Sequence, residues 1–142
     1  MEASWITGRW DKLQGYLDLC ATQESSDFNV GIGSALRTLR QRKESEGQAF
    51  ADKSAVFSEI INGLRLSIVK SLTANSVTSL QSCHDDMLRL HALADVESIA
   101  NVGAGTSLAD SAALRRRLDV LGGYIADKQY LLGLRRAAME LA

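Results

Sequence analysis

The stretch EASWITGRWDKLQGYL, residues 2–17, holds both tryptophans of the chain on either side of a glycine. The apolar residues around Trp5 have helical spacing, and the pattern stops at Gly8. Glycine ends helices readily because it tolerates positive φ. The pattern resumes at Trp10 and continues at helical spacing to Leu17. The stretch therefore predicts a helix, a tight turn and a second helix.

The two tryptophan rings suit the interior of a helical hairpin. Trp5 would fill the angle between paired helices, Gly8 would permit the turn, and Trp10, Tyr16 and Leu17 would supply the second helix. This arrangement is typical of tetratricopeptide-like hairpins. One such ring buries about 150–250 Å². We predict that both rings lock the first hairpin, while ordinary bundle packing remains an alternative.

Helical periodicity continues through the rest of the chain. It predicts helices at 28–42, 48–72, 77–100 and 108–122, with a last one over the apolar residues from 130 to 141. No stretch alternates apolar and polar residues over the length of a strand, and the chain contains no proline. We therefore predict an all-α fold of about six or seven helices, joined as antiparallel hairpins in a tetratricopeptide-like α-solenoid or a bundle.

The domain organisation predicted from these patterns is simple. Residues 1–142 form one helical-repeat segment, and the glycine-rich stretch 101–110 is a flexible internal loop. The small residues of VGIG, 30–33, let a neighbouring helix approach closely. The last helix runs to the final residues without a cap, which leads us to expect a piece of a longer protein.

The composition excludes several classes of function. The chain has 142 residues, 46% of them hydrophobic, and its 16 basic residues nearly balance its 17 acidic ones. This balance gives no drive toward nucleic acid or an anionic membrane. Cys20 and Cys83 are too few for a disulfide scaffold and predict reduced thiols. Without a signal peptide or a long apolar run, we expect a soluble intracellular protein.

One cluster carries metal-ligand chemistry, residues 83–86 together with His91. On a helix, His84 and His91 share a face, but the helix rise separates them by about 10 Å, which is too far for one metal. His91 and Asp95 have the i, i+4 spacing of helical zinc ligands, yet two ligands do not make a site. We therefore predict no metal site. We expect His91 to lie at a helix–helix contact, and Asp85 and Asp86 to face water.

Other motifs also fall short of a chemical site. GAGTS, 103–107, lacks the lysine of a phosphate loop, and VGIG lacks the third glycine of a dinucleotide fingerprint. The sequence has no kinase motif and no nucleophile elbow. The arginines at 115–117 and 135–136 fan around helices with acidic neighbours, so solvated or interhelical roles are favoured over phosphate binding. We predict no catalytic residue, no cofactor and no enzyme activity in this chain.

Four motifs in order resemble one family. The opening stretch resembles the E-A-x-W-x-x-x-x-W-D-x-x-x-x-Y-L hairpin of the FAT region in phosphatidylinositol-3-kinase-related protein kinases. FNVGIGSAL (28–36), RLHALADVE (89–97) and YIADKQYLLGLRRA (124–137) are similar to its later motifs. The last motif has one residue more before L-R-R and lacks a common proline, and 101–110 matches no family motif. The closest branch looks like the ATR-type DNA-damage checkpoint kinases, including their fungal members.

The resemblance implies a FAT scaffold that wraps and regulates the kinase domain of a nuclear serine/threonine kinase. The catalytic residues would lie beyond residue 142, so none is carried over. The implied partners are the rest of the parent kinase chain, meaning its kinase domain and adjacent helical repeats, and protein regulators, with no nucleic acid and no membrane. Arg89, His91 and Glu97 match motif positions and are assigned packing and helix–helix polar contacts, and Arg135 of L-R-R is also assigned a structural role.

Two other functions stay open at this point. One is a free-standing helical adaptor that binds a partner helix. The other is a small metal-binding helical bundle centred on Cys83, His84 and His91.

Overall fold

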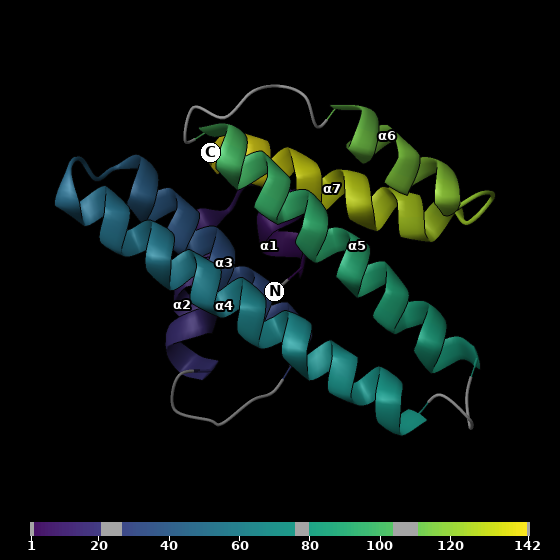
Figure 1. The fold of residues 1–142 in the computed structure, drawn as a ribbon. Helices are drawn as coiled ribbons and strands as arrows, with labels where there is room; N and C mark the ends of the chain where they lie inside the picture. The colour runs from purple at the N-terminus through teal and green to yellow at the C-terminus, as the bar shows by residue number, and fades with distance from the viewer. Residues whose placement is uncertain (1, 21–26, 76–79, 104–110, 142) are drawn as a thin grey trace.

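The computed structural model describes residues 2–20, 27–75, 80–103 and 111–141, which form seven helices and no strand (Figure 1). The prediction of an all-α fold is confirmed. The helices are α1 (Glu2–Ile6), α2 (Trp10–Cys20), α3 (Phe28–Lys43), α4 (Gln48–Asn75), α5 (Leu80–Gly103), α6 (Ser111–Val120) and α7 (Ile125–Leu141).

The helix boundaries differ from the predicted ones at several ends. α4 continues past residue 72 to Asn75, and α7 begins before the predicted residue 130, at Ile125. Residues 101–103 were predicted to belong to a flexible loop, but they form the last turn of α5. Asn101 and Val102 each cost a helix less than about 1 kcal/mol relative to alanine, so α5 can continue to Gly103. The rest of that predicted loop, 104–110, lies outside the described residues, as does the predicted helix start at 77–79.

α3 and α4 form a closely packed hairpin. Asp27 caps α3, because its Oδ1 accepts a hydrogen bond from the Asn29 amide at 3.0 Å. A Cβ placed on Gly31 would lie 2.3 Å from Cδ2 of Leu64, so a larger residue here would displace the Leu64 side chain of α4. The prediction that the small residues of VGIG permit a close helix approach is therefore confirmed.

The core lies where helices from both ends of the chain meet. Helices α2 to α5 pack in chain order, whereas α7 packs against α1, α3 and α5 (Figure 1). Fully buried leucines and isoleucines of α3, α5 and α7, such as Leu36, Leu93 and Leu131, fill this region. None of the described helices combines the length and the apolar character that crossing a membrane requires.

Candidate functional site

The turn between α1 and α2 has the geometry that its sequence predicts. Gly8 has φ +67°, its amide donates to the Trp5 carbonyl at 3.2 Å, and the Arg9 amide donates to the Ser4 carbonyl at 2.8 Å. This pair of bonds is a Schellman ending, which requires a left-handed residue after the helix. Trp5 is 1% exposed, and Trp10 is half-buried against the core. The turn therefore directs both rings inward.

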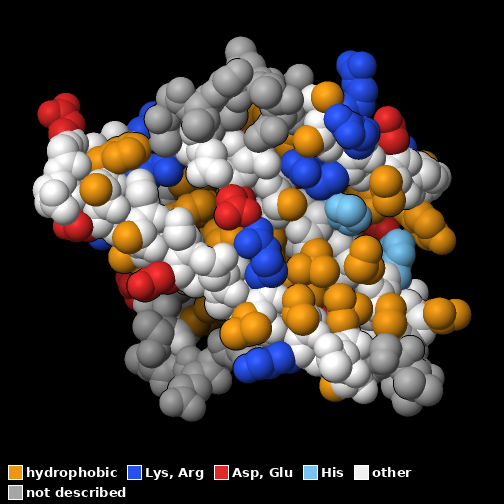
Figure 2. Space-filling model, in the orientation of Figure 1, with side chains coloured by type: hydrophobic (Ala, Val, Ile, Leu, Met, Phe, Trp, Pro, Cys, Tyr) orange, Lys and Arg blue, Asp and Glu red, His pale blue; other side chains and the backbone are white. Residues whose placement is uncertain are grey.

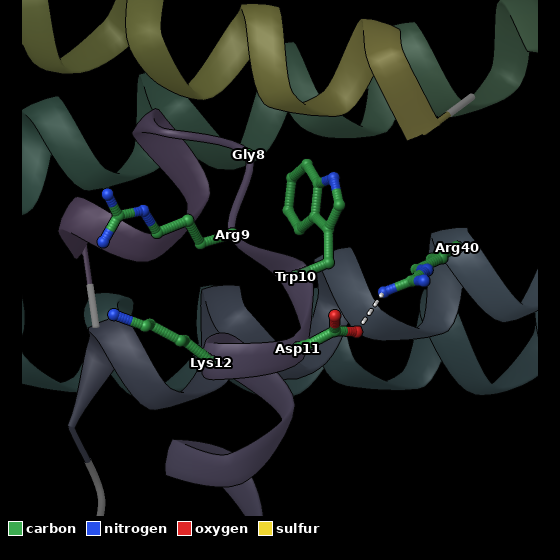
Figure 3. Close-up of a pocket in the computed structure, with 6 residues that line it drawn as sticks. All are labelled: Gly8, Arg9, Trp10, Asp11, Lys12 and Arg40. Carbon is green, nitrogen blue, oxygen red and sulfur yellow. Dashed lines mark ion pairs between the residues drawn. The ribbon is translucent and has the colours of Figure 1, made fainter.

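An open groove lies beside this turn. Figure 3 shows its lining, which comprises Gly8 to Lys12 and Arg40, around a volume of 360 Å³. Asp11 and Arg40 face each other at 3.8 Å, while Arg9 and Lys12 extend toward the other side of the turn. Asp11 is fully exposed, and exposed ion pairs contribute little stability. The groove presents charges to solvent without any arrangement suited to catalysis.

Two other residues of the first hairpin, which are neighbours on α2, differ in exposure. Leu17 is 3% exposed and belongs to the core, whereas Tyr16 is 47% exposed. Leu17 is thus placed for the structural role assigned to it, while Tyr16 presents much of its ring to solvent.

A buried carboxylate joins α5, α6 and α7. Asp95 of α5 is 0% exposed, and its Oδ2 accepts from Nε of Arg135 at 2.6 Å. Its Oδ1 accepts from Nε of Arg117. The two arginines reach further, since Arg117 Nη2 donates to Ser98 Oγ at 3.3 Å and Arg135 Nη2 to the Leu114 carbonyl at 2.6 Å. We call Asp95, Arg117 and Arg135 the Asp95 junction.

The two arginines of the Asp95 junction compensate the buried charge of Asp95. A carboxylate without solvent exposure is strongly destabilising unless cations and hydrogen bonds compensate its charge. Here each oxygen of Asp95 receives one guanidinium donor from a different helix. Of the two roles predicted for the arginine clusters, Arg117 and Arg135 have the interhelical one, while Arg115, Arg116 and Arg136 are exposed to solvent.

Two cations at the end of α3 bind the ends of two other helices. Arg42 Nη2 donates to the Ala100 carbonyl in the last turn of α5 at 2.8 Å, and Lys43 Nζ donates to the Glu140 carbonyl near the end of α7 at 2.8 Å. Helix C-termini carry partial negative charge, so cations are favourable there. Arg42 is 4% exposed, its guanidinium lies 5.1 Å from the Phe50 ring centroid, and burial lowers its pKa.

We predict that Arg42→Met destabilises the fold, because it keeps the apolar stem but removes the donor to Ala100. A buried hydrogen bond from a charged group contributes about 1.5–3 kcal/mol, and the free energy of unfolding should fall by that amount. Urea denaturation followed by circular dichroism measures it. Arg40→Met is the matched control, since within the described residues Arg40 pairs with two exposed carboxylates, and its loss should change stability by less than about 1 kcal/mol. Equal losses in both variants would contradict the role of Arg42.

His84 belongs to the cluster with metal-ligand chemistry, and it contacts residues near the start of α7. His84 Nε2 lies 2.6 Å from Asp127 Oδ2, and its ring is 4.9 Å from that of Tyr124. His84 therefore links the start of α5 to the start of α7. Across 2–20, 27–75, 80–103 and 111–141, no group of three or more potential ligands could hold a metal ion.

Asp86 was predicted to face water, and this prediction is wrong. Its residue is 4% exposed, and its carboxylate accepts from Ser71 Oγ at 3.0 Å and from Arg89 Nη1 at 3.4 Å. The physical reason is that Asp86 lies on the side of α5 that packs against α4. Asp85 is half-buried and accepts from Gln81 on its own helix at 3.1 Å.

Two of the remaining motif residues on α5 lie at contacts with other helices. The Arg89 guanidinium is 5.4 Å from the Phe28 ring centroid, which connects α5 with α3. Glu97 Oε2 accepts from Arg65 Nη2 at 2.5 Å, which connects α5 with α4. His91 is half-buried. Arg89 and Glu97 thus connect α5 with α3 and α4.

Sequence reasoning missed Asp95, Arg42 and Lys43 as contact residues, although two of them carried a signal. Asp95 interrupts a run of apolar residues on α5, and a carboxylate on a buried stripe must find cationic partners. Arg42 follows Leu39 by three positions and so continues the apolar face of α3. Lys43 lies one position off that face, and its partner at residue 140 has no local signal.

The described helices and their polar contacts define a helical scaffold, in which charged side chains fix helices to one another. The FAT domain model matches residues 1–142. The chain therefore belongs to the FAT domain family, the non-catalytic helical regions of phosphatidylinositol-3-kinase-related protein kinases. No curated protein and no solved structure gives a significant match.

Proposed function

We propose that this chain is the scaffold segment of an ATR-like serine/threonine checkpoint kinase, which supports and regulates a kinase domain outside the chain in DNA-damage signalling. The observation that carries the proposal is the FAT match over residues 1–142. The order of the four sequence motifs supports the ATR-like branch. Nuclear localisation follows from the same resemblance.

The contacts between helices suit a segment that passes the displacement of one helix on to others. The Asp95 junction ties α5 to α6 and α7, while Arg42 and Lys43 tie α3 to the ends of α5 and α7. Fully satisfied buried polar networks rigidify a fold and specify one arrangement. A displacement imposed on α3 would therefore move α5 and α7 with it, and a kinase domain resting on those helices would respond.

The surface suits contacts with the rest of a larger chain. Figure 2 shows hydrophobic side chains gathered over α4 and α5, toward the lower right of the view. Large apolar residues of these two helices are exposed, among them Leu66, Val69, Leu80 and Met87. Contiguous exposed apolar surface marks interaction sites. The proposed occupants are adjacent helical repeats and the kinase domain of the parent chain.

The proposal is tested on the parent protein. The reading frame that contains this chain is sequenced, and the encoded protein is purified from cells grown with and without a DNA-damaging agent. We expect a kinase domain in the same frame and phosphate transfer from ATP to serine and threonine peptides that rises after damage. A frame without a kinase domain would contradict the proposal and favour the free-standing adaptor. A kinase unresponsive to damage would contradict the ATR-like branch.

A matched pair of variants tests the scaffold role within that protein. Asp95→Ala disrupts the Asp95 junction, whereas Asp119→Ala removes an exposed aspartate on α6. We expect the first to change damage-dependent kinase activity and the second to leave it unchanged. Identical activity in both variants, with the protein folded, would contradict coupling between this scaffold and the kinase.

A further inference from the structure

α6 differs from the other described helices in what it buries. Each of the other six contributes at least one buried residue, whereas residues 112–120 of α6 contribute none. Leu118 packs only partly buried against the core. Local stability follows buried apolar contacts, so α6 has the weakest hydrophobic attachment of the described helices. In Figure 1 it lies at the outer edge of the molecule, beside α7.

Polar contacts attach α6 to α5 and α7. Arg117 of α6 donates to Asp95 and Ser98 of α5, and the Leu114 carbonyl of α6 accepts from Arg135 of α7. Both attachments converge on the Asp95 junction. The polar attachment of α6 therefore depends on one carboxylate and the two guanidinium groups around it.

The chain after α6 has the features of a pivot. Leu121 is 5% exposed and anchors the turn in the core, and Gly122 follows with φ +56°. The Tyr124 amide donates to the Leu121 carbonyl at 3.2 Å, which closes the turn before α7. The Leu121 amide donates to the Leu118 carbonyl at 3.3 Å and the Gly122 amide to the Asp119 carbonyl at 3.0 Å, so a movement of α6 about Leu121 breaks these two bonds.

Departure of α6 would take the Leu114 carbonyl away from Arg135 but would leave Asp95 paired with Arg135. Asp95 accepts from Arg135 through its other oxygen, so its carboxylate keeps a cationic partner without Arg117. The large penalty for an unpaired buried charge is thus avoided in the open state. Of the two guanidinium groups on Asp95, that of Arg117 is the more accessible, since the Arg117 side chain is 20% exposed against 9% for Arg135.

From these observations we infer that α6 is a detachable arm, which undocks from α5 and α7 by pivoting at Leu121–Gly122 while the other described helices stay packed, with the Arg117–Asp95 pair as its latch. This inference is independent of the identity of the parent kinase. Undocking uncovers the polar strip of Asp95, Ser98 and Arg135. An isolated helix of ten residues is marginal in water, so the free arm loses its helical hydrogen bonds.

Hydrogen exchange of the 142-residue chain, followed by mass spectrometry, tests the arm. In the unaltered chain, we expect peptides from α6 to exchange faster than peptides from α5 and α7. Exchange of α6 at the same rate and with the same cooperativity as α5 and α7 would overturn the inference. This comparison requires no variant and so does not depend on a substitution being tolerated.

A matched pair of variants then tests the latch. Arg117→Gln removes the charged donor to Asp95, and loss of such a bond should accelerate α6 exchange by about tenfold or more while α3 and α4 stay protected. Arg116→Gln, an exposed neighbour, should leave α6 exchange within about twofold of the unaltered chain. Equal acceleration by both variants, or acceleration of α3 and α4 to match α6, would overturn the assignment of the latch.

Discussion

Asp95→Ala is expected to lower the free energy of unfolding by about 3–5 kcal/mol, the typical cost of removing one partner from a buried ion pair. The substitution leaves Arg135, whose side chain is 9% exposed, without the carboxylate that compensates it. It also removes the acceptor for Arg117 of α6. Urea denaturation monitored by circular dichroism gives the value, and small domains have only about 5–15 kcal/mol in total.

The control for Asp95→Ala is Asp119→Ala, an exposed aspartate on α6. Surface substitutions of this kind change stability by about 0.5 kcal/mol or less. If Asp95→Ala costs no more than Asp119→Ala, Asp95 is not buried between the two arginines.

Trp5→Ala is the second substitution with a large expected effect. Trp5 is 1% exposed, and removal of a fully buried tryptophan costs about 3–5 kcal/mol through lost transfer free energy and the cavity left behind. The loss falls at the contact of α1 with α3 and α7, so α7 should lose protection together with α1. Urea denaturation measures the stability, and hydrogen exchange locates the loss.

Two further variants calibrate the Trp5 result. Tyr16→Ala removes a ring that is 47% exposed and should cost much less. The stability loss of Trp5→Phe should lie between the losses of the two alanine variants. Phenylalanine keeps an aromatic ring in the core, and the Nε1 that it removes has no hydrogen-bond partner in the part of the chain that the structure describes. A Trp5→Ala loss as small as that of Tyr16→Ala would contradict its place in the core.

The elements with strong local signals were predictable from sequence. The turn at Gly8 follows from a helical pattern that breaks at a glycine, and α3 begins at the predicted Phe28, immediately after the aspartate that caps it. The apolar period of α4 predicts one long helix, and the structure extends it by three residues to Asn75. Such signals lie within a few residues of the feature they predict.

The long-range contacts were not predictable in the same way. The partners of Asp95 lie 22 and 40 residues away, and Lys43 reaches a carbonyl 97 residues away. Periodicity marks a buried face but does not say which helix covers it, so the return of α7 to α1 and α3 has no local signal. Asp86 was misplaced for the same reason, since its exposure depends on how α5 packs against α4.

The link between α5 and α7 through the Asp95 junction is tested most directly by a double-mutant cycle, in which unfolding free energies are measured for Asp95→Ala, Arg135→Met and the double variant. Contacting residues have coupling energies of about 0.5–3 kcal/mol, and we predict a value of about 2 kcal/mol or more, because the second substitution removes a charge that the first has already left unpaired. Additive losses, within about 0.5 kcal/mol, would show that these side chains do not meet and would contradict the arrangement of α5 and α7 described above.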